Sequence, residues 1–364
     1  MEFFTKQDIL ASGYGVLYAV SSAGETLAVK ALNYNTPPLQ LSTYTALLSN
    51  QLWIFMLPIY WMQRKERWAL KKQYWGQYCI IGSLTFLITL LRNISLNLVP
   101  GSVFSLLIST SILFNIVLSK LFLKKVFTYW HLLAALFCLA SACSIGFASL
   151  FTTQEQFKGV DYKIGVGTSI LSAFFGAIMG VTQEYIQPTW DNYDVRIVEI
   201  TIASSLISTG FIVLYGTLSK ELVSWAPVIT DATRSQEGLL LVIGVSCLLP
   251  IIKLIARNTK YATIKISSAF FFEFAQASSS LVGSIASILV FQEPWGPEYI
   301  ASIVLMAISF ALYIQTKRVV IMPPPPDYPK DELRIINPLE KVIKTTSSLQ
   351  QVNGNTVVIV TLWK

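Results

Sequence analysis

Charged side chains are scarce in this sequence. Asp, Glu, Lys and Arg make up 13% of its 364 residues, whereas an ordinary globular chain holds about 25%. Hydrophobic residues make up 53%, so a soluble domain of this size could not cover its surface with polar groups. Four cysteines are too few for a secreted disulfide scaffold, and the hydrophobicity excludes intrinsic disorder. The class that remains is an integral membrane protein with many spans.

Motifs for catalysis, metal binding and nucleotide binding are also missing. His131 is the only histidine, so the usual zinc site cannot be built. The sequence has no Gly-rich phosphate loop, which disfavours ATP-driven transport, and we expect no cofactor. The net charge of +7 does not indicate nucleic-acid binding, because the basic residues fall between hydrophobic runs. We therefore expect a membrane protein that is not an enzyme.

Hydrophobic runs long enough to cross a bilayer recur along the chain, since a spanning helix needs roughly 20 apolar residues. Ten spans are predicted, at 9–31, 39–62, 77–97, 102–123, 127–149, 165–187, 197–217, 238–256, 262–290 and 298–316. Residues 1–8 lack the basic start of a signal peptide, so the first run is expected to stay as a span.

Basic residues between the spans indicate the orientation. The even-numbered connections carry eleven lysines and arginines, and the odd-numbered ones carry five. In this count Arg196 follows the sixth span, and Arg257 and Lys260 follow the eighth. Because cytoplasmic loops are enriched in Lys and Arg, we place the even connections and both termini in the cytoplasm.

The two halves of the chain resemble each other weakly. The string ILASGYG at 9–15 matches ILSAFFG at 170–176, an offset of 161 residues, and Arg92 matches Lys253 at the same offset. A unit of five spans crosses the membrane an odd number of times, so a second copy enters from the opposite side. We predict an all-α membrane protein with ten transmembrane helices in a 5+5 inverted-topology repeat.

The predicted organisation has three parts. Residues 1–150 form the first five-helix repeat, 151–318 the second, and 319–364 a disordered cytoplasmic tail. Four consecutive prolines, Pro323 to Pro326, form a stiff polyproline stretch in this tail. A ligand for a proline-recognising domain is the alternative interpretation of that stretch.

Short motifs carry a family resemblance. ILVFQEP at 288–294 is an apolar run that ends in a Glu, and RNTKYA at 257–262 forms a link before the ninth span. GSVFSLL at 101–107 is their first-half counterpart. Over residues 9–316 the chain resembles the drug/metabolite transporter superfamily in its ten-span, EamA-like form, with comparable strings in purine-permease-like and nucleotide-sugar-transporter-like members. Lys125 departs from the pattern, because a Glu is common at that position.

Charged residues within the spans are the first candidates for a substrate site, because a lone charge at the bilayer centre costs about 2.5–3.5 kcal/mol. Glu25 and Arg92 lie in the outer thirds of the first and third spans and are placed to pair. Glu184 and Lys253 repeat an acid and a base at mirrored depths in the second half. We interpret these residues as charged gates or anchors that flank a central cavity. The alternative is that they snorkel to the interfaces.

Glu273 is the strongest single candidate. It lies well inside the ninth span, and no basic residue is obvious at its depth. Either it lines the cavity or it is protonated, because desolvation favours the neutral acid; both states would suit proton coupling or a cationic group on the substrate. The alternative is a neutral Glu hydrogen-bonded between helices. Gln276, Asn115 and Asn93 are expected to add hydrogen-bonding walls, with interhelical packing as the alternative.

These features predict a secondary-active transporter or exchanger that moves a small organic metabolite by alternating access. Because Glu273 leaves the core acidic, a neutral or nitrogenous solute is favoured. A nucleotide-sugar or phosphate-ester antiporter is the alternative, which Lys265 would favour if it points inward. An intramembrane lipid-modifying enzyme is the alternative of another class. The expected partners are the solute, the lipid bilayer and, if transport is coupled, protons.

Overall fold

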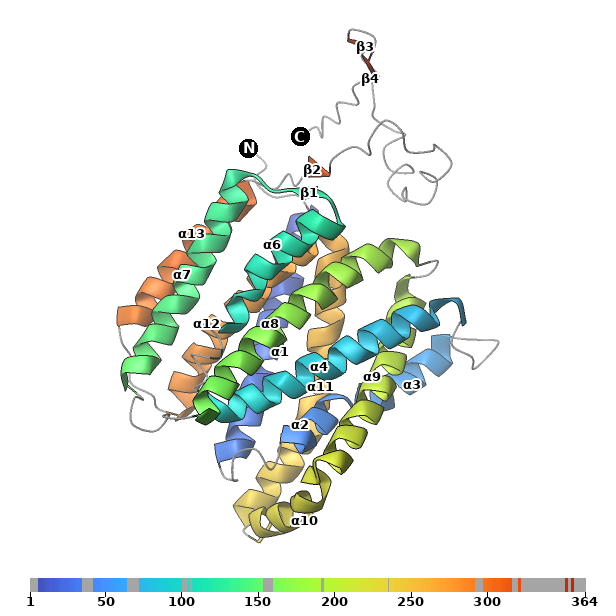
Figure 1. Cartoon of the computed structure of the whole chain (residues 1–364), viewed down its shortest axis with the longest axis vertical. Helices are drawn as coiled ribbons and strands as arrows, with labels where there is room; N and C mark the ends of the chain where they lie inside the picture. Colours follow the sequence, from blue (N-terminus) through green and yellow to red (C-terminus); the bar gives the residue numbers. More distant parts are fainter. Residues whose placement is uncertain are drawn as a thin grey trace.

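A computed structural model shows a bundle of long helices (Figure 1). The structure describes residues 6–34, 42–63, 72–99, 104, 107–152, 160–190, 193–234, 236–291, 297–315, 320–321, 351–352 and 355–356. In Figure 1 the start of the first helix and the end of the last lie at the same end of the bundle.

The helices follow one another along the chain with short connections. They are α1 (Lys6–Tyr34), α2 (Ser42–Ser49), α3 (Leu52–Gln63), η1 (Lys72–Tyr74), α4 (Trp75–Leu98), α6 (Ser111–Phe122), α7 (Tyr129–Thr152), α8 (Val160–Ile186), η2 (Gln187–Thr189), α9 (Tyr193–Leu218), α10 (Glu221–Ala232), α11 (Gln236–Ile266), α12 (Ala269–Phe291) and α13 (Pro297–Gln315).

Each of the ten predicted spans falls on one or two of these helices. Within the described residues, four helical segments are long and apolar enough to cross a membrane, namely Lys72–Leu98, Tyr162–Thr189, Tyr193–Leu218 and Gly238–Ile266. Shorter apolar helices occur at Leu107–Phe122, Tyr129–Ser144 and Ile300–Tyr313. The structure is therefore that of a helical membrane protein, and the count of ten crossings stays a prediction.

The structure corrects the sequence-based boundaries in three places. The second predicted span is broken between α2 and α3, at Asn50 and Gln51. The eighth predicted span ends at 256, but α11 continues without a break to Ile266. A helix that the sequence did not predict, α10, lies between the seventh and eighth spans. The second correction matters most, because it moves Arg257 and Lys260 from a connection into a helix.

The helix α6 shows how the bundle distributes polar and apolar residues. Ser111, Asn115 and Ser119 follow one another at helical spacing and are buried. On the opposite side Val117 is 55% exposed and Leu121 is 67% exposed. A soluble helix has the reverse pattern. A polar inner face and an apolar outer face suit a helix that packs against protein on one side and faces lipid on the other.

Helices from the two predicted halves interleave. The first helix of the first half, α1, packs against α11 and α12. The first helix of the second half, α8, packs against α4 and α6 in the same way. Each therefore contacts the third and fourth helices of the other half, as a reversed repeat predicts. The superposition of the two halves stays a prediction.

Small residues allow close approach between some of these helices. A Cβ on Gly82 of α4 would lie 2.8 Å from Ile207 of α9. A Cβ on Gly165 of α8 would lie 2.7 Å from Leu98 at the end of α4. Tight packing through small residues is typical of membrane helices, and it fixes α4 between α8 and α9.

Among the described residues, three short strand segments follow α13. Val320–Ile321 (β2) pairs antiparallel with Lys125–Val126 (β1), which follows α6. Gln351–Val352 (β3) pairs with Asn355–Thr356 (β4). The rest of the predicted tail, including the polyproline stretch, lies outside the described residues.

Candidate functional site

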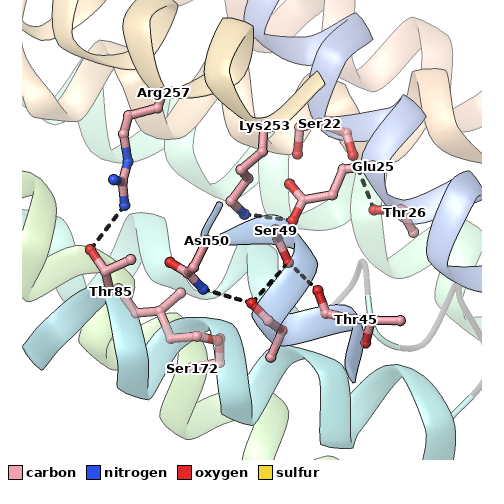
Figure 2. Close-up of polar contacts among 12 residues, drawn as sticks. Ser22, Glu25, Thr26, Thr45, Ser49, Asn50, Thr85, Ser172, Lys253 and Arg257 are labelled. Atoms are coloured by element: carbon pink, nitrogen blue, oxygen red, sulfur yellow. Dashed lines mark hydrogen bonds and ion pairs between the residues drawn. The ribbon is translucent and has the colours of Figure 1, made fainter. Parts of the chain in front are cut away.

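An ion pair between α1 and α11 lies inside the bundle (Figure 2). Lys253 Nζ lies 2.5 Å from Glu25 Oε1, and the two side chains are 16% and 11% exposed. The sequence suggested that Glu25 pairs with Arg92, but its ion-pair partner in the structure is Lys253. Glu25 pairs across the two predicted halves, because α1 packs against α11 along its length.

The two helices present matching polar faces at this contact. Tyr18, Ser22 and Glu25 are spaced i, i+4 and i+7 on α1. Lys253, Arg257 and Lys260 have the same spacing on α11. Residues at this spacing lie on one face of a helix. One face of α11 therefore carries three cationic groups toward the interior.

Arg257 is the most deeply buried of these cations, at 6% exposure. Its guanidinium donates hydrogen bonds to the hydroxyl oxygens of Ser204 (3.1 Å) and Ser205 (3.0 Å) on α9. It also donates to Thr85 Oγ1 on α4 at 3.2 Å (Figure 2). Among the described residues, no carboxylate lies within ion-pair distance of it. The sequence-based assignment of Arg257 to a cytoplasmic connection is wrong.

The break between α2 and α3 brings a polar residue to the same region. Asn50 is 1% exposed, and its Nδ2 donates to the Ala46 carbonyl at 2.8 Å. That bond orients the amide, and Oδ1 has no hydrogen-bond partner in the described part of the chain. Figure 2 draws Asn50 between the Arg257–Thr85 contact and the Lys253–Glu25 pair. A broken helix at membrane depth is tolerated only inside protein or beside a hydrated space.

Glu273 lies on α12 in a separate hydrogen-bonded network. It is 2% exposed; Ser111 donates to its Oε2, and Asn115 Nδ2 donates to Oε1 at 3.5 Å. Gln276 Nε2 donates to Ser111 Oγ at 3.2 Å, and Tyr18 OH donates to Gln276 Oε1 at 3.3 Å. The structure thus brings together Glu273, Gln276 and Asn115. Both carboxyl oxygens of Glu273 accept hydrogen bonds from α6. This arrangement agrees with the second interpretation of the sequence, in which Glu273 is hydrogen-bonded between helices.

Two further cations lie near these networks. Lys260 Nζ lies 4.8 Å from the centre of the Phe272 ring and within electrostatic range of Glu273. Arg92 lies 5.7 Å from the centre of the Phe104 ring and within electrostatic range of Glu25. The expectation that no basic residue stands near Glu273 is therefore wrong, because Lys260 was assigned to a connection.

Asn93 and Lys265 complete the account of the predicted interior. Asn93 is 5% exposed, and its Nδ2 has no hydrogen-bond partner among the described residues. Lys265 is exposed, and its Nζ lies 3.5 Å from the centre of the Tyr193 ring. Lys265 therefore does not supply the inward cation that the sequence considered.

Glu184 stands apart from Lys253. It forms an ion pair with Lys125 and accepts a hydrogen bond at 3.0 Å from the backbone N–H of Ala269, the first residue of α12. A carboxylate at a helix N-terminus satisfies a free N–H and favours the helix dipole. Glu184 and Lys253, the acid and the base noted in the second half, therefore have different partners. Lys125, which departs from the family pattern, is the base that Glu184 contacts.

A second buried ion pair holds α9 against α3 and α4. Arg196 and Glu199 lie one turn apart on α9, at 3% and 0% exposure. Tyr78 OH donates to Glu199 at 2.7 Å and Tyr60 OH at 3.4 Å. Arg196 was assigned to a cytoplasmic connection, and the structure places it inside the helix instead. This cluster joins three helices through a paired charge and has the form of a structural link.

Sequence reasoning missed Arg257, Lys260 and Asn50. The positive-inside rule assigned the two basic residues to a loop. Their spacing from Lys253 along a continuous α11 was the available signal. For Asn50 the available signal was the run of three polar residues, Ser49, Asn50 and Gln51, which interrupts the second predicted span.

These features define a multi-pass helical membrane protein with charged and polar groups at its centre. Residues 9–147 match the model of the EamA-like transporter family. The match confirms the resemblance to the drug/metabolite transporter superfamily, whose members are transporters rather than enzymes.

The solved structures extend the comparison to the fold. One crystal structure of a protein is 14% identical, with a TM-score of 0.63, and the alignment covers 85% of this chain and 97% of that one. At this identity the likeness shows the fold alone. In all, 27 chains of solved structures match. A comparison with curated proteins gave no match.

Proposed function

We propose that this protein is a secondary-active transporter or exchanger that moves a small organic metabolite by alternating access. The two five-helix units, 1–150 and 151–318, would be the moving parts. The reciprocal packing of α1 with α11 and α12, and of α8 with α4 and α6, supports this arrangement. In inverted-repeat carriers the substrate site lies near the midplane between the repeats.

The observation that carries the proposal is the ion pair between Glu25 and Lys253 inside an apolar bundle. Buried charges in a membrane are costly and are associated with substrate or ion pathways. This pair joins a helix of the first half to a helix of the second. We propose that it forms in one orientation of the carrier and breaks in the other, so that it serves as a gate.

Glu273 is proposed as the site of proton coupling. Its carboxyl group links α12 to α6 through Ser111 and Asn115. Gain of a proton would change one carboxyl oxygen from acceptor to donor, and loss of the proton would restore the acceptor. The Ser111 and Asn115 contacts would then rearrange, and the proton would bias the two orientations differently.

For the solute, the sequence favours a neutral or nitrogenous metabolite with Glu273 as its partner. The phosphate-ester alternative has a specific observation in its favour, because Arg257 is a buried cation without a paired carboxylate among the described residues. The orientation with both termini in the cytoplasm is retained as part of the proposal.

Counterflow in proteoliposomes tests the transport function. Vesicles with purified protein are loaded with an unlabelled solute, and uptake of the labelled solute is followed for nucleobases, amines, amino acids and phosphate esters. Transient accumulation of one of these solutes, absent from protein-free vesicles, is expected. Formation of a new product without translocation would instead support an intramembrane enzyme.

A further inference from the structure

The charges of the central region are unevenly partnered. Glu25 already pairs with Lys253, and both oxygens of Glu273 accept hydrogen bonds from α6. Neither acid forms an ion pair with Arg257, which contacts hydroxyl groups on α4 and α9. Glu25 lies within electrostatic range of Arg257 but is paired with Lys253. The positive charge of Arg257 is oriented by these hydroxyls, but they do not neutralise it.

A buried cation in this state has a clear physical preference. Removal of a guanidinium from water is costly unless an anion compensates it. The planar guanidinium also presents several N–H groups in a fixed fork, which matches the two oxygens of a carboxylate or a phosphate. Two of its nitrogens are held by the hydroxyls of Thr85, Ser204 and Ser205, so its plane is set before a ligand arrives.

Asn50 provides an independent second observation. Its Oδ1 is a buried acceptor without a partner among the described residues, and the bond from Nδ2 to Ala46 fixes which way the amide faces. A buried carbonyl oxygen needs a donor. Asn50 lies at the break between α2 and α3. Backbone groups left unpaired by such a break are tolerated only inside protein or beside a hydrated space.

We propose that Arg257 and Asn50 form the solute subsite for an organic anion. Arg257 binds the acidic group, either a carboxylate or a phosphate, and Asn50 Oδ1 accepts a hydrogen bond from a hydroxyl or N–H group of the same molecule. This inference rests on the proposed carrier function and specifies the charge of its solute. An anionic solute replaces the neutral solute that the sequence favoured. The sequence analysis assigned Arg257 and Lys260 to a connection, so it did not count them as cations of the interior.

The proposal predicts an unusual stability pattern for Arg257→Gln. If the guanidinium were a structural link, its loss would lower the melting temperature of the purified protein. If it waits for an anion, the variant without ligand melts at the same temperature as the wild type or higher. Arg234→Gln is the matched control, since the Arg234 side chain is 77% exposed and forms an ion pair with the surface residue Asp231.

Binding is tested by thermal unfolding of the full-length protein in detergent with glutamate, glucose 6-phosphate, inorganic phosphate and uncharged glucose at millimolar concentrations. Glutamate or glucose 6-phosphate is expected to raise the melting temperature of the wild type and of Arg234→Gln, whereas glucose is not. In Arg257→Gln the Kd of that anion should rise by about thirtyfold or more, because a buried charge-assisted contact is lost. Asn50→Ala should raise the Kd of the same anion by a smaller factor.

The outcomes separate the sources of the anion and the two proposals. Stabilisation by glucose 6-phosphate alone assigns a phosphate ester, and stabilisation by glutamate alone assigns a carboxylate. No stabilisation by any anion, or equal stabilisation of Arg257→Gln, would overturn the subsite. Binding that depends on Arg257 without counterflow of that anion would leave the subsite standing and reject the carrier. Counterflow of an uncharged solute at the same rate in Arg257→Gln and the wild type would support the carrier and reject the subsite.

Discussion

Two buried arginines in this protein have opposite surroundings. Arg196 pairs with Glu199 on its own helix, and two tyrosine hydroxyls complete the carboxylate. Arg257 contacts three hydroxyls and has no paired carboxylate among the described residues. A compensated charge holds neighbouring helices in place, whereas an uncompensated one is left for a ligand or a moving part. The comparison therefore separates structural polar groups from candidate functional ones.

The largest expected effect on stability concerns the compensated pair of Arg196 and Glu199. Glu199→Gln leaves the Arg196 guanidinium buried without its carboxylate, and the free energy of unfolding should fall by about 3–5 kcal/mol. Thermal or denaturant unfolding in detergent measures the loss. Asp231→Asn, which breaks the exposed pair with Arg234, should change stability by less than about 1 kcal/mol. Equal stability of Glu199→Gln and the wild type would contradict the structural role.

The pair between Glu25 and Lys253 is expected to affect transport more than stability. Because it joins the two halves, Glu25→Gln should slow counterflow by roughly 5- to 150-fold, the range of a typical coupling between sites. The exchange of the two charges in Glu25→Lys with Lys253→Glu should restore part of the rate. A double variant as slow as the single one would show that the pair is not a gate.

Glu273 tests the third kind of polar group, a carboxyl with hydrogen-bond partners on a neighbouring helix. Glu273→Gln keeps the size and one acceptor but cannot exchange a proton. A pH gradient should therefore no longer accelerate uptake, while uptake without a gradient continues. Glu298→Gln, at the start of α13, is the control. Undiminished dependence on the gradient in Glu273→Gln would remove Glu273 from proton coupling.

The smallest effect concerns the packing that positions these groups. Gly82→Ala introduces a Cβ 2.8 Å from Ile207, and overpacking of this kind costs about 1–3 kcal/mol. Gly167→Ala on α8 meets no atom within 4 Å and should be neutral or stabilise the helix by about 1 kcal/mol or less. The difference in melting temperature measures this contrast. Equal stability of the two variants would contradict the close approach of α4 and α9.

The sequence predicted the helices better than it predicted their partners. Long apolar runs are a strong signal, and each predicted span falls on a helix. Pairing was harder, because the sequence suggests an acid and a base within each half. In the structure, Glu25 pairs across the halves and Glu184 pairs with Lys125. Contacts between helices far apart in the chain leave no local pattern to read.

The site was predicted in part for a physical reason. Glu273, Gln276 and Asn115 were identified because polar residues are conspicuous within apolar runs, and the structure brings them together. Arg257 was misplaced because basic residues usually mark the end of a span. The helix α11 continues through Arg257 to Ile266. The positive-inside rule, which concerns loops, was therefore applied to a residue on the buried face of a helix.

Alternating access is the central claim, and the accessibility of Ser22 tests it most directly. Ser22 is 3% exposed and lies one turn from Glu25 on the inner face of α1. In a variant with the four native cysteines replaced, Ser22→Cys is exposed to a membrane-impermeant maleimide from either side of oriented vesicles. The account predicts slow labelling from both sides. Labelling from one side only, or from neither, would contradict a carrier that opens its centre to each side in turn.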